Sequence, residues 1–491
     1  MNPGSVRTIA VVGGGVSGSL LALKLHAARP DFRLVVVESA RRPGRGLAYG
    51  ACSPRHLLNV PVSRMEVGLT PGFGAWLQAN PRALAALPAA LAESGGDIGA
   101  AFAPRSLFGD YLEERIAEAL TSDPGSGLAV IRGEAVRVLA PPGRGLGLSD
   151  GRRLDADVIV LATGNLPPRA PRAPDPWFYD SPAFAPDPWA SDAFEDLAPD
   201  DPVLFLGSGL TMVDIALELE ARGHRGPMLA ISRRGLVPAT HAAGGRWPAF
   251  LEEGLPASPL RLMGLIRANV AAAGASGIPW QRVFDAARPA VPAVWRSWSL
   301  SQRRQFLRHV RTRWDVRRHR MAPRIAAALE ALRASGRLEI LAARPTAWRR
   351  VRCAGRPAVE AALAVRGGGG RRFVAARVLD CTGPRRDLAD LGTPLLADLR
   401  DRGLAVADPL GLGLETADSA LLDSAGRPSP WLYALGALTC PSWWEITAVP
   451  EICVQVDNLV AHLAQDGAQD GATAPAHPLS PEDFLDLGAG I

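Results

Sequence analysis

The stretch TIAVVGGGVSG, residues 8–18, decides the fold of this chain. Residues 8–12 form an apolar run typical of a buried strand, and the apolar residues after the glycines predict a helix. The glycines have the spacing G-x-G-x-x-G. In that spacing Gly13 permits a tight turn, Gly15 lets a pyrophosphate approach the backbone, and Gly18 lets the helix lie close to the strand. The stretch therefore predicts a strand, turn and helix that bind a dinucleotide.

A carboxylate follows at the distance that this motif requires. Residues 34–37 form a second, valine-rich run, and Glu38 stands at its end, twenty residues after Gly18. A carboxylate at this position accepts hydrogen bonds from ribose hydroxyls and repels a 2′-phosphate. Glycine alone is a weak signal in a chain with 51 glycines, but the strands, the helix and Glu38 occur together. We therefore predict that this unit binds FAD through its adenosine ribose.

A second strand, turn, helix and strand begin at residue 203. The turn keeps Gly207 and Gly209 but has Met212 where the third glycine is expected, so Met212 must either push the helix away from the strand or pack beneath it. The next strand ends on three residues that suit a phosphate: Ser232, Arg233 and Arg234. Because arginine pairs with a 2′-phosphate, we expect NADPH here. NADH with incidental arginines is the alternative.

These two units organise the whole chain. We expect an α/β fold with two Rossmann-like dinucleotide-binding domains. The FAD-binding domain is predicted to be discontinuous, from residues 1–199 and 377–491, and the NAD(P)H-binding domain to cover 200–376, with a helical insert at about 250–330. Two further apolar runs end on the tripeptides ATG at residues 162–164 and CTG at 381–383, which either mark chain crossings between the units or are ordinary turns.

Composition excludes several functional classes. The 491 residues are 47% hydrophobic and 21% charged, as in a globular protein, and no run of eighteen apolar residues predicts a membrane span. Glycines interrupt the apolar residues 9–25, so we do not expect a signal peptide, and we expect the protein in the cytoplasm. The five cysteines form no C-x-x-C pair, which argues against a disulfide framework, a metal site and a dithiol relay.

The basic residues point to small anions rather than to nucleic acid. The net charge is +5, almost all positive residues are arginines, and Lys24 is the only lysine, so a phosphate loop and a Schiff base are not expected. Only residues 303–320 carry a dense run of arginines. There Phe306, Val310 and Trp314 recur every four residues, which predicts an amphipathic helix with a solvated basic face or, alternatively, an anion-binding segment.

Several blocks in order along the chain carry a resemblance. They are GLAYG at 46–50, HLLNVP at 56–61 with Met65, PRSLFG at 104–109, GLTMVD at 209–214, SRRGL at 232–236, WD at 314–315, RHR at 318–320, WE at 444–445 and AVPE at 448–451. With the first glycine motif, these blocks resemble the FAD/NAD(P)-binding flavoproteins related to class B monooxygenases. That family includes a bacterial urate hydroxylase and an aspartate N-monooxygenase.

The resemblance implies positions for the flavin. It implies that residues 57–65 lie along the flavin ring and ribityl chain, and that residues 447–451, opening the last helix, face its pyrimidine edge. A helix N-terminus there suits the negative charge of a reduced flavin, although an ordinary capped helix is the alternative. One departure is that Gly436 is followed by Ala437, where many FAD folds have an acidic residue. The predicted cofactor-binding residues are Gly13, Gly15, Gly18, Glu38, Leu58, Asn59, Met65, Thr163, Gly164, Gly207, Gly209, Thr211, Ser232, Arg233, Arg234, Gly383, Gly436, Thr447, Ala448 and Val449.

Catalytic side chains are harder to predict, because the cofactors carry hydride chemistry themselves. His56 and His241 adjoin cofactor motifs and are candidate proton donors, with hydrogen-bonded structural roles as the alternative. Arg64 and Arg246 are candidate anion binders beside the arginine-rich segment.

The favoured function is an FAD-dependent, NAD(P)H-using monooxygenase. With O2 it would hydroxylate a small polar, anionic nitrogen compound that is urate-like or amino-acid-like, such as aspartate. A flavin oxidoreductase that passes electrons to a quinone or a partner protein is the second hypothesis, and a non-catalytic flavin-binding sensor is the third.

Overall fold

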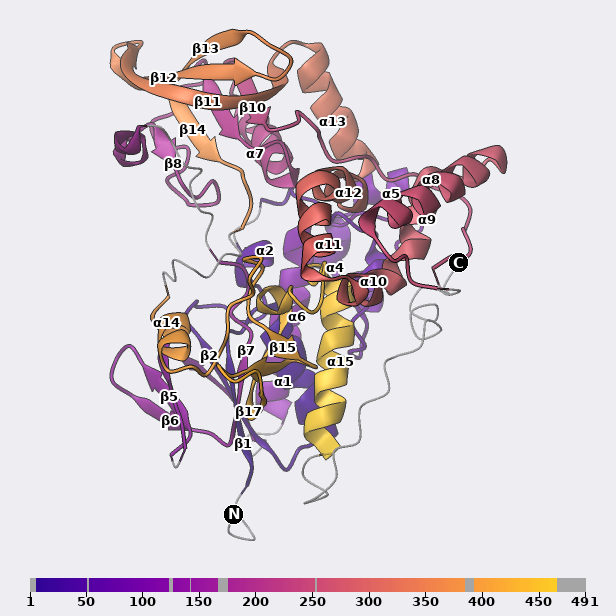
Figure 1. Cartoon of the computed structure of the whole chain (residues 1–491), viewed down its shortest axis with the longest axis vertical. Helices are drawn as coiled ribbons and strands as arrows, with labels where there is room; N and C mark the ends of the chain where they lie inside the picture. Colours follow the sequence, from indigo (N-terminus) through magenta and orange to yellow (C-terminus); the bar gives the residue numbers. More distant parts are fainter. Residues whose placement is uncertain are drawn as a thin grey trace.

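The computed structural model describes residues 6–50, 53–122, 127–141, 143–166, 175–251, 254–384 and 393–465. Cys52 and part of the proline-rich connection expected before residue 200 lie outside these ranges. The described chain forms two units, each built on a seven-stranded sheet, with a group of helices beside them (Figure 1). The expected α/β fold with two Rossmann-like units is confirmed.

The first sheet has the order β15-β16-β17-β7-β1-β2-β3. Its five parallel strands are β1 (Thr8–Val12), β2 (Arg33–Glu38), β3 (Leu128–Arg132), β7 (Val158–Leu161) and β17 (Pro428–Ala434), and the antiparallel edge is β15 (Thr416–Ala417) and β16 (Ala420–Leu422). Helices α1 (Val16–Ala28) and α15 (Val449–Gln465) run side by side and share one core with the sheet. The first and last helices therefore belong to the same unit, although the whole second unit separates them in sequence.

The second sheet has the order β13-β12-β11-β10-β9-β14-β8. Its strands are β8 (Phe184–Ala185), β9 (Val203–Leu206), β10 (Met228–Ser232), β11 (Leu338–Cys353), β12 (Arg356–Val365), β13 (Gly370–Ala375) and β14 (Arg377–Asp380). Strands β8 to β11 and β14 pair in parallel, and β12 and β13 extend the long β11 as an antiparallel hairpin. Helices α7 (Leu210–Ala221) and α13 (Pro323–Ala334) pack on one face of this sheet.

Two strands lie in the second sheet rather than where the sequence prediction placed them. β14 pairs with β9, with Arg377 opposite Val203, and β8 pairs with β14. The expected boundaries at 199/200 and 376/377 are therefore wrong for these strands, since both were assigned to the FAD-binding domain. An apolar run of two to four residues does not reveal which of two similar sheets it joins, because both sheets bury the same kinds of side chain.

The expected helical insert is present. It consists of α8 (Pro259–Ala275), α9 (Trp280–Ala287), η3 (Arg288–Ala290), α10 (Val291–Ser297), α11 (Leu300–Gln305), the π-helical turn η4 (Phe306–Val310) and α12 (Arg311–Arg318). Phe306 and Trp314 are buried in a core that also contains Trp444 and Ile446 from the first unit. The predicted apolar stripe is thus correct, and it packs the insert against the segment that leads into α15 (Figure 1).

The remaining elements complete the first unit and the connections. They are α2 (Gly46–Gly50), η1 (Val62–Arg64), α3 (Phe73–Ala79), α4 (Pro81–Ala85), α5 (Pro88–Glu93), α6 (Arg105–Ser122), η2 (Pro176–Asp180), α14 (Pro394–Asp401), η5 (Gly436–Thr439) and a small sheet of β4 (Ala135–Leu139), β5 (Gly145–Leu148) and β6 (Arg153–Asp155). Across the described ranges, every helix is too short or too polar to span a membrane.

Candidate cofactor-binding and active site

The first glycine turn is built around close backbone contacts. Gly13 has φ 101°, and a side chain there would overlap the carbonyl oxygen of Ala162. A side chain at Gly18 would overlap the carbonyl oxygen of Gly13. A Cβ on Gly15, by contrast, would meet only Gly46, whose Cα lies at 3.4 Å and whose amide nitrogen lies at 3.9 Å, both ordinary contacts. Backbone contacts within the chain therefore require glycine at positions 13 and 18. At Gly15 the chain leaves room for a side chain, which fits a ligand that approaches the backbone there.

The second turn has the same construction. Gly207 has φ 114°, and a side chain there would overlap the carbonyl oxygen of Cys381. A Cβ on Gly209 would have no neighbour within 4 Å. Met212 is completely buried in the core between α7 and the sheet. Of the two arrangements the sequence allowed, Met212 therefore packs beneath the helix, and the open glycine position beside it is retained.

The tripeptides ATG and CTG lie beside these turns. Each follows a parallel strand, β7 or β14, and the carbonyl of its first residue, Ala162 or Cys381, lies against the first glycine of the neighbouring turn. Gly164 and Gly383 have φ 72° and 90°, with no neighbour within 4 Å of an added Cβ. The hydroxyl of Thr163 is buried and has no hydrogen-bond partner among the described residues. Since buried hydroxyls are normally paired, Thr163 is placed as a ligand-binding group would be.

The ends of two strands complete the first cradle. The Gly14 amide donates to the Glu38 carboxylate at 2.6 Å, so Glu38 lies directly against the glycine turn. The Gly436 amide donates to Gln455 at 2.9 Å, and a Cβ on Gly436 would lie 2.8 Å from the Ser17 hydroxyl. Gly436 is therefore held against the first turn of α1. The residues present fit a bound dinucleotide, with a carboxylate for the ribose and backbone amides for the pyrophosphate.

An arginine cluster stands at the end of β10 in the second unit. Burial lowers the pKa of Arg234, and the neighbouring Arg313, Arg366 and Arg233 lower it further. Among the described residues, no carboxylate contributes to this shift. The expected Arg233 and Arg234 are thus joined by Arg313 from α12 and by Arg366 from the turn after β12, which the sequence analysis missed. Four arginines without a nearby counter-charge suit a phosphate.

Ser232 has a local role beside this cluster. Its hydroxyl accepts from the Ser208 hydroxyl at 2.8 Å and from the Gly235 amide at 3.0 Å. Ser232 therefore ties the glycine turn to the segment after β10. Thr211 lies in the first turn of α7, after the open Gly209.

The segment expected along the flavin runs between the two units. Its Leu58 amide donates to the Ala103 carbonyl at 2.8 Å, while the side chains of Leu58 and Met65 are 3% and 1% exposed in the core. These two residues can reach a ligand only through their backbone. The Asn59 carbonyl lies 2.8 Å from His241 Nε2, so this segment is attached to the loop after β10. Its contact with the flavin stays a prediction.

Both candidate histidines are engaged in contacts between the units. Burial lowers the pKa of His241 to about 4, so it is neutral at neutral pH and donates through Nε2 to the Asn59 carbonyl. His56 accepts from the Ser53 amide through Nδ1 at 3.1 Å, and its Nε2 lies 3.9 Å from Glu218. Burial also lowers the pKa of His56. These contacts favour the structural alternative over proton donation for both.

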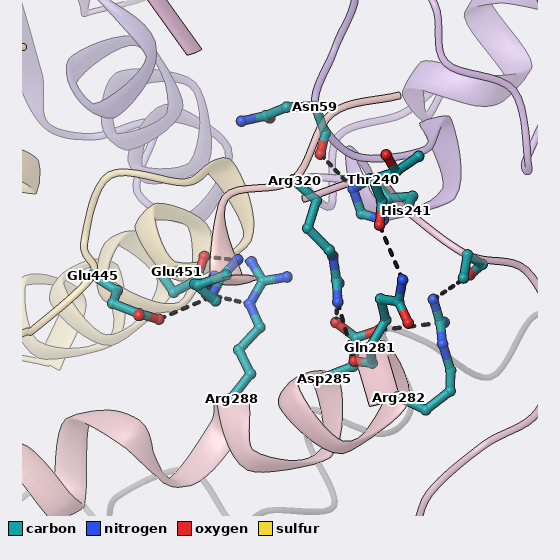
Figure 2. A network of polar contacts seen from close by, with 12 residues as sticks. Asn59, Thr240, His241, Gln281, Arg282, Asp285, Arg288, Arg320, Glu445 and Glu451 are labelled. Carbon is teal, nitrogen blue, oxygen red and sulfur yellow. Dashed lines mark hydrogen bonds and ion pairs between the residues drawn. The ribbon is translucent and has the colours of Figure 1, made fainter. Parts of the chain in front are cut away.

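The segment before α15 contains a buried ion-pair network that the sequence analysis missed. Glu445 has φ 73°, which is unusual for a residue with a side chain, and it accepts from Trp314 Nε1 and, at 2.9 Å, from Arg318 Nε. Arg318 also donates to Glu451 at 2.8 Å. Arg288 donates to the same carboxylate at 2.6 Å (Figure 2). Burial raises the pKa of Glu451, but Arg288 and Arg318 outweigh it and hold that pKa at about 2.

This network connects the insert to the predicted flavin-facing residues. The Thr447 amide donates to the Glu445 carbonyl at 2.6 Å, Ala448 precedes the helix, and α15 begins at Val449. Since Glu445 is tied to α12, the insert sets the backbone just before the helix N-terminus. The arginine-rich segment is therefore not simply a solvated face, because Arg318 and Arg320 are 7% and 4% exposed.

Comparison with known proteins identifies the N-terminal cradle. Residues 10–166 match the model of a family described as FAD-NAD(P)-binding. No curated protein matches the chain significantly in sequence.

Three solved structures are similar over almost the whole chain. An L-lysine 6-monooxygenase from Pseudomonas syringae is 17% identical with a TM-score of 0.63, covering 95% of this chain and 100% of its own. The ornithine N-hydroxylase of Kutzneria sp. 744, solved with reduced FAD, NADP+ and L-ornithine, is 16% identical with a TM-score of 0.62, covering 94% and 100%. A cadaverine monooxygenase from Erwinia amylovora, bound to FAD, is 12% identical with a TM-score of 0.64, covering 97% and 100%.

At these identities the likeness establishes the fold. The cradle that the matched segment contains is the one built by the first glycine turn, Glu38 and Thr163. The expected resemblance to FAD/NAD(P)-binding flavoproteins is confirmed: the chain carries an FAD-NAD(P)-binding domain at residues 10–166. As a whole it shares its fold with these three solved structures.

Proposed function

We propose that the protein is an FAD-dependent, NAD(P)H-using monooxygenase that hydroxylates a small nitrogen-containing compound. The observation that carries this proposal is the pair of equivalent glycine turns, one beside a carboxylate and the other beside an arginine cluster without a counter-charge. An acidic turn suits FAD, and a basic turn suits the 2′-phosphate of NADPH. The structurally similar enzymes act on ornithine, lysine and cadaverine, which supports an amine as substrate.

The chain's own groups bind and orient the cofactors. The open position at Gly15 and the N-terminus of α1 would hold the FAD pyrophosphate, with Glu38 at its ribose. The cluster of Arg233, Arg234, Arg313 and Arg366 would hold the 2′-phosphate of NADPH. When bound, the flavin accepts a hydride from the nicotinamide and activates O2.

The protein's remaining task is to exclude water and to place the substrate nitrogen. The N-terminus of α15 contributes backbone donors on the side that the resemblance assigns to the pyrimidine edge. Urate-like and amino-acid-like compounds, which the resemblance implies, are the first candidates, alongside the amines of the structural relatives.

Oxygen uptake tests the proposal. Purified protein loaded with FAD should consume NADPH and O2 when the right nitrogen compound is added, and the product should contain one oxygen atom from 18O2, detectable by mass spectrometry. Reduction of a quinone without substrate-dependent oxygen uptake would instead favour the flavin oxidoreductase. Bound FAD with no turnover of either acceptor would favour the sensor.

A further inference from the structure

Five arginines and three carboxylates meet between the insert and the segment that runs along the predicted flavin site. The arginines are Arg64, Arg282, Arg288, Arg318 and Arg320, and the carboxylates are Asp285, Glu445 and Glu451. They come from η1, α9, η3, the end of α12 and the residues after it, and the first turn of α15 and the residues before it, so only the tertiary fold assembles them. We call this group the arginine junction, and Figure 2 shows most of its members.

Four of the arginines have acidic partners. Arg288 and Arg318 pair with Glu451, and Arg318 also pairs with Glu445. Arg282 lies 3.3 Å from Asp285, and Arg320 pairs with the other oxygen of the same carboxylate. These contacts use all three carboxylates of the junction.

Arg64 has no such partner. It forms no hydrogen bond or ion pair with any residue in the described ranges. Burial lowers its pKa, and so do Arg288, Arg282 and Arg320, while Asp285 opposes them. With five cations and three anions, the junction holds an excess of two positive charges. Like charges held together away from bulk water are costly unless an anion neutralises them.

Two further donors in the junction lack partners. The Nε atoms of Arg282 and Arg320 are buried without a hydrogen-bond acceptor in the described structure, although Arg320 as a whole is 4% exposed. Buried guanidinium N–H groups normally find an acceptor. The junction thus combines a free guanidinium with unsatisfied donors on two of its neighbours.

The neighbouring polar groups do not supply the missing negative charge. His241 is neutral because burial lowers its pKa to about 4, and its Nε2 is committed to the Asn59 carbonyl. The Gln281 amide nitrogen donates to the Thr240 carbonyl at 3.1 Å. Arg64 follows Asn59 by five residues, within the segment expected along the flavin, so an anion at Arg64 would lie beside the predicted flavin site.

We propose that the arginine junction binds the carboxylate of the substrate, with Arg64 as the residue that selects it. The inference rests on the proposed function and narrows it: the substrate is a small amine that carries carboxylates, and a dicarboxylate would balance the excess charge. A guanidinium and a carboxylate form two parallel charge-assisted hydrogen bonds, which also orient the amine. Diamines that carry only positive charge are repelled by the same excess.

Succinate is a direct probe, because it has two carboxylates and no amine to hydroxylate. Its dissociation constant for the FAD-loaded protein, measured by calorimetry, should rise at least about tenfold in Arg64→Met, while succinamide binds neither protein. Arg64→Lys should recover part of the affinity. Arg55→Met, which removes an exposed arginine from the same loop, is the matched control and should bind succinate normally.

Other measurements separate this site from a cofactor phosphate site. In Arg64→Met the FAD content and the KM for NADPH should stay unchanged, and the melting temperature should not fall, because no ion pair is lost. The inference would be overturned if Arg64→Met bound succinate as tightly as the unchanged protein. It would also be overturned if Arg64→Met lost affinity for FAD or NADPH instead of affinity for succinate.

Turnover distinguishes the two proposals. If the protein hydroxylates cadaverine with the same kcat/KM as an amine that carries two carboxylates, the inference fails and the proposed function stands. If succinate binding depends on Arg64 but no amine supports oxygen uptake, the site stands as a carboxylate site and the proposed function fails.

Discussion

Arg318 Nε donates to the Glu445 carboxylate at 2.9 Å, across 127 residues of sequence. One residue ends the last helix of the insert, and the other stands just before α15 with φ 73°. Burial lowers the pKa of Arg318, but Glu445 and Glu451 outweigh it and raise that pKa above its ordinary value. Arg318 therefore stays charged, and its contacts with Glu445 and Glu451 fix the insert to the first unit.

Removing one side of this pair should be severe. Arg318→Met leaves the buried Glu445 without its cationic partner and Glu451 with Arg288 as its remaining one. We therefore expect a loss of about 3–5 kcal/mol in the free energy of unfolding, measured with urea. The double variant Arg318→Met/Glu445→Gln should lose less than Arg318→Met alone, since one uncompensated charge is gone. Arg304→Met, in an exposed position on α11, is the control and should be close to neutral. A small loss in Arg318→Met would show that the network is not needed to fix the insert.

The arginine cluster after β10 predicts cofactor preference. Replacing Arg233 and Arg234 by alanine should raise the KM for NADPH about tenfold or more and leave the KM for NADH nearly unchanged, because only NADPH has the 2′-phosphate. Arg313→Ala and Arg366→Ala should shift the same ratio in the same direction. Arg349→Ala, in an exposed position on β11, is the control, and its KM values for NADPH and NADH in steady-state kinetics should both stay unchanged. Equal effects on both cofactors would contradict the phosphate assignment.

The open position at Gly15 predicts flavin content. Gly15→Leu should fold but purify without yellow colour, because its side chain would occupy the space that the protein leaves for the pyrophosphate. Gly264→Leu, an exposed helical glycine with no neighbour within 4 Å of an added Cβ, should retain FAD. The absorbance at about 450 nm, near the usual flavin maximum, divided by the protein concentration gives the FAD content of both variants. A yellow Gly15→Leu protein would mean that FAD binds elsewhere.

His241 predicts acid sensitivity. Its pKa falls from about 6.5 in the unfolded chain to about 4 in the folded protein, so the unfolded state binds more protons between these values. Stability should therefore decrease as the pH falls from about 6.5 to about 4, by roughly 1–3 kcal/mol from this residue. In His241→Gln, the free energy of unfolding from denaturant titrations should change less steeply with pH between about 6.5 and 4. Glu451 acts lower, because its stabilising charge is lost only as the pH falls below about 4.5 towards 2.

The sequence by itself determined the local parts of this protein. The glycine turns, Glu38 at the end of β2 and the arginines after β10 are set by neighbours within about twenty-five residues, and glycine spacing and strand periodicity report such geometry directly. These signals were enough to predict two Rossmann-like units and the order of their elements.

Only the tertiary structure decided which distant residues meet. It placed β8 and β14 in the second sheet, brought Arg313 and Arg366 to Arg234, and left Arg64 without a partner among the described residues. Charge balance at a buried point depends on every group that packs around it, and those groups come from segments hundreds of residues apart. A one-dimensional pattern contains no distances of that kind, so the charges that surround the candidate site could be read only from the fold.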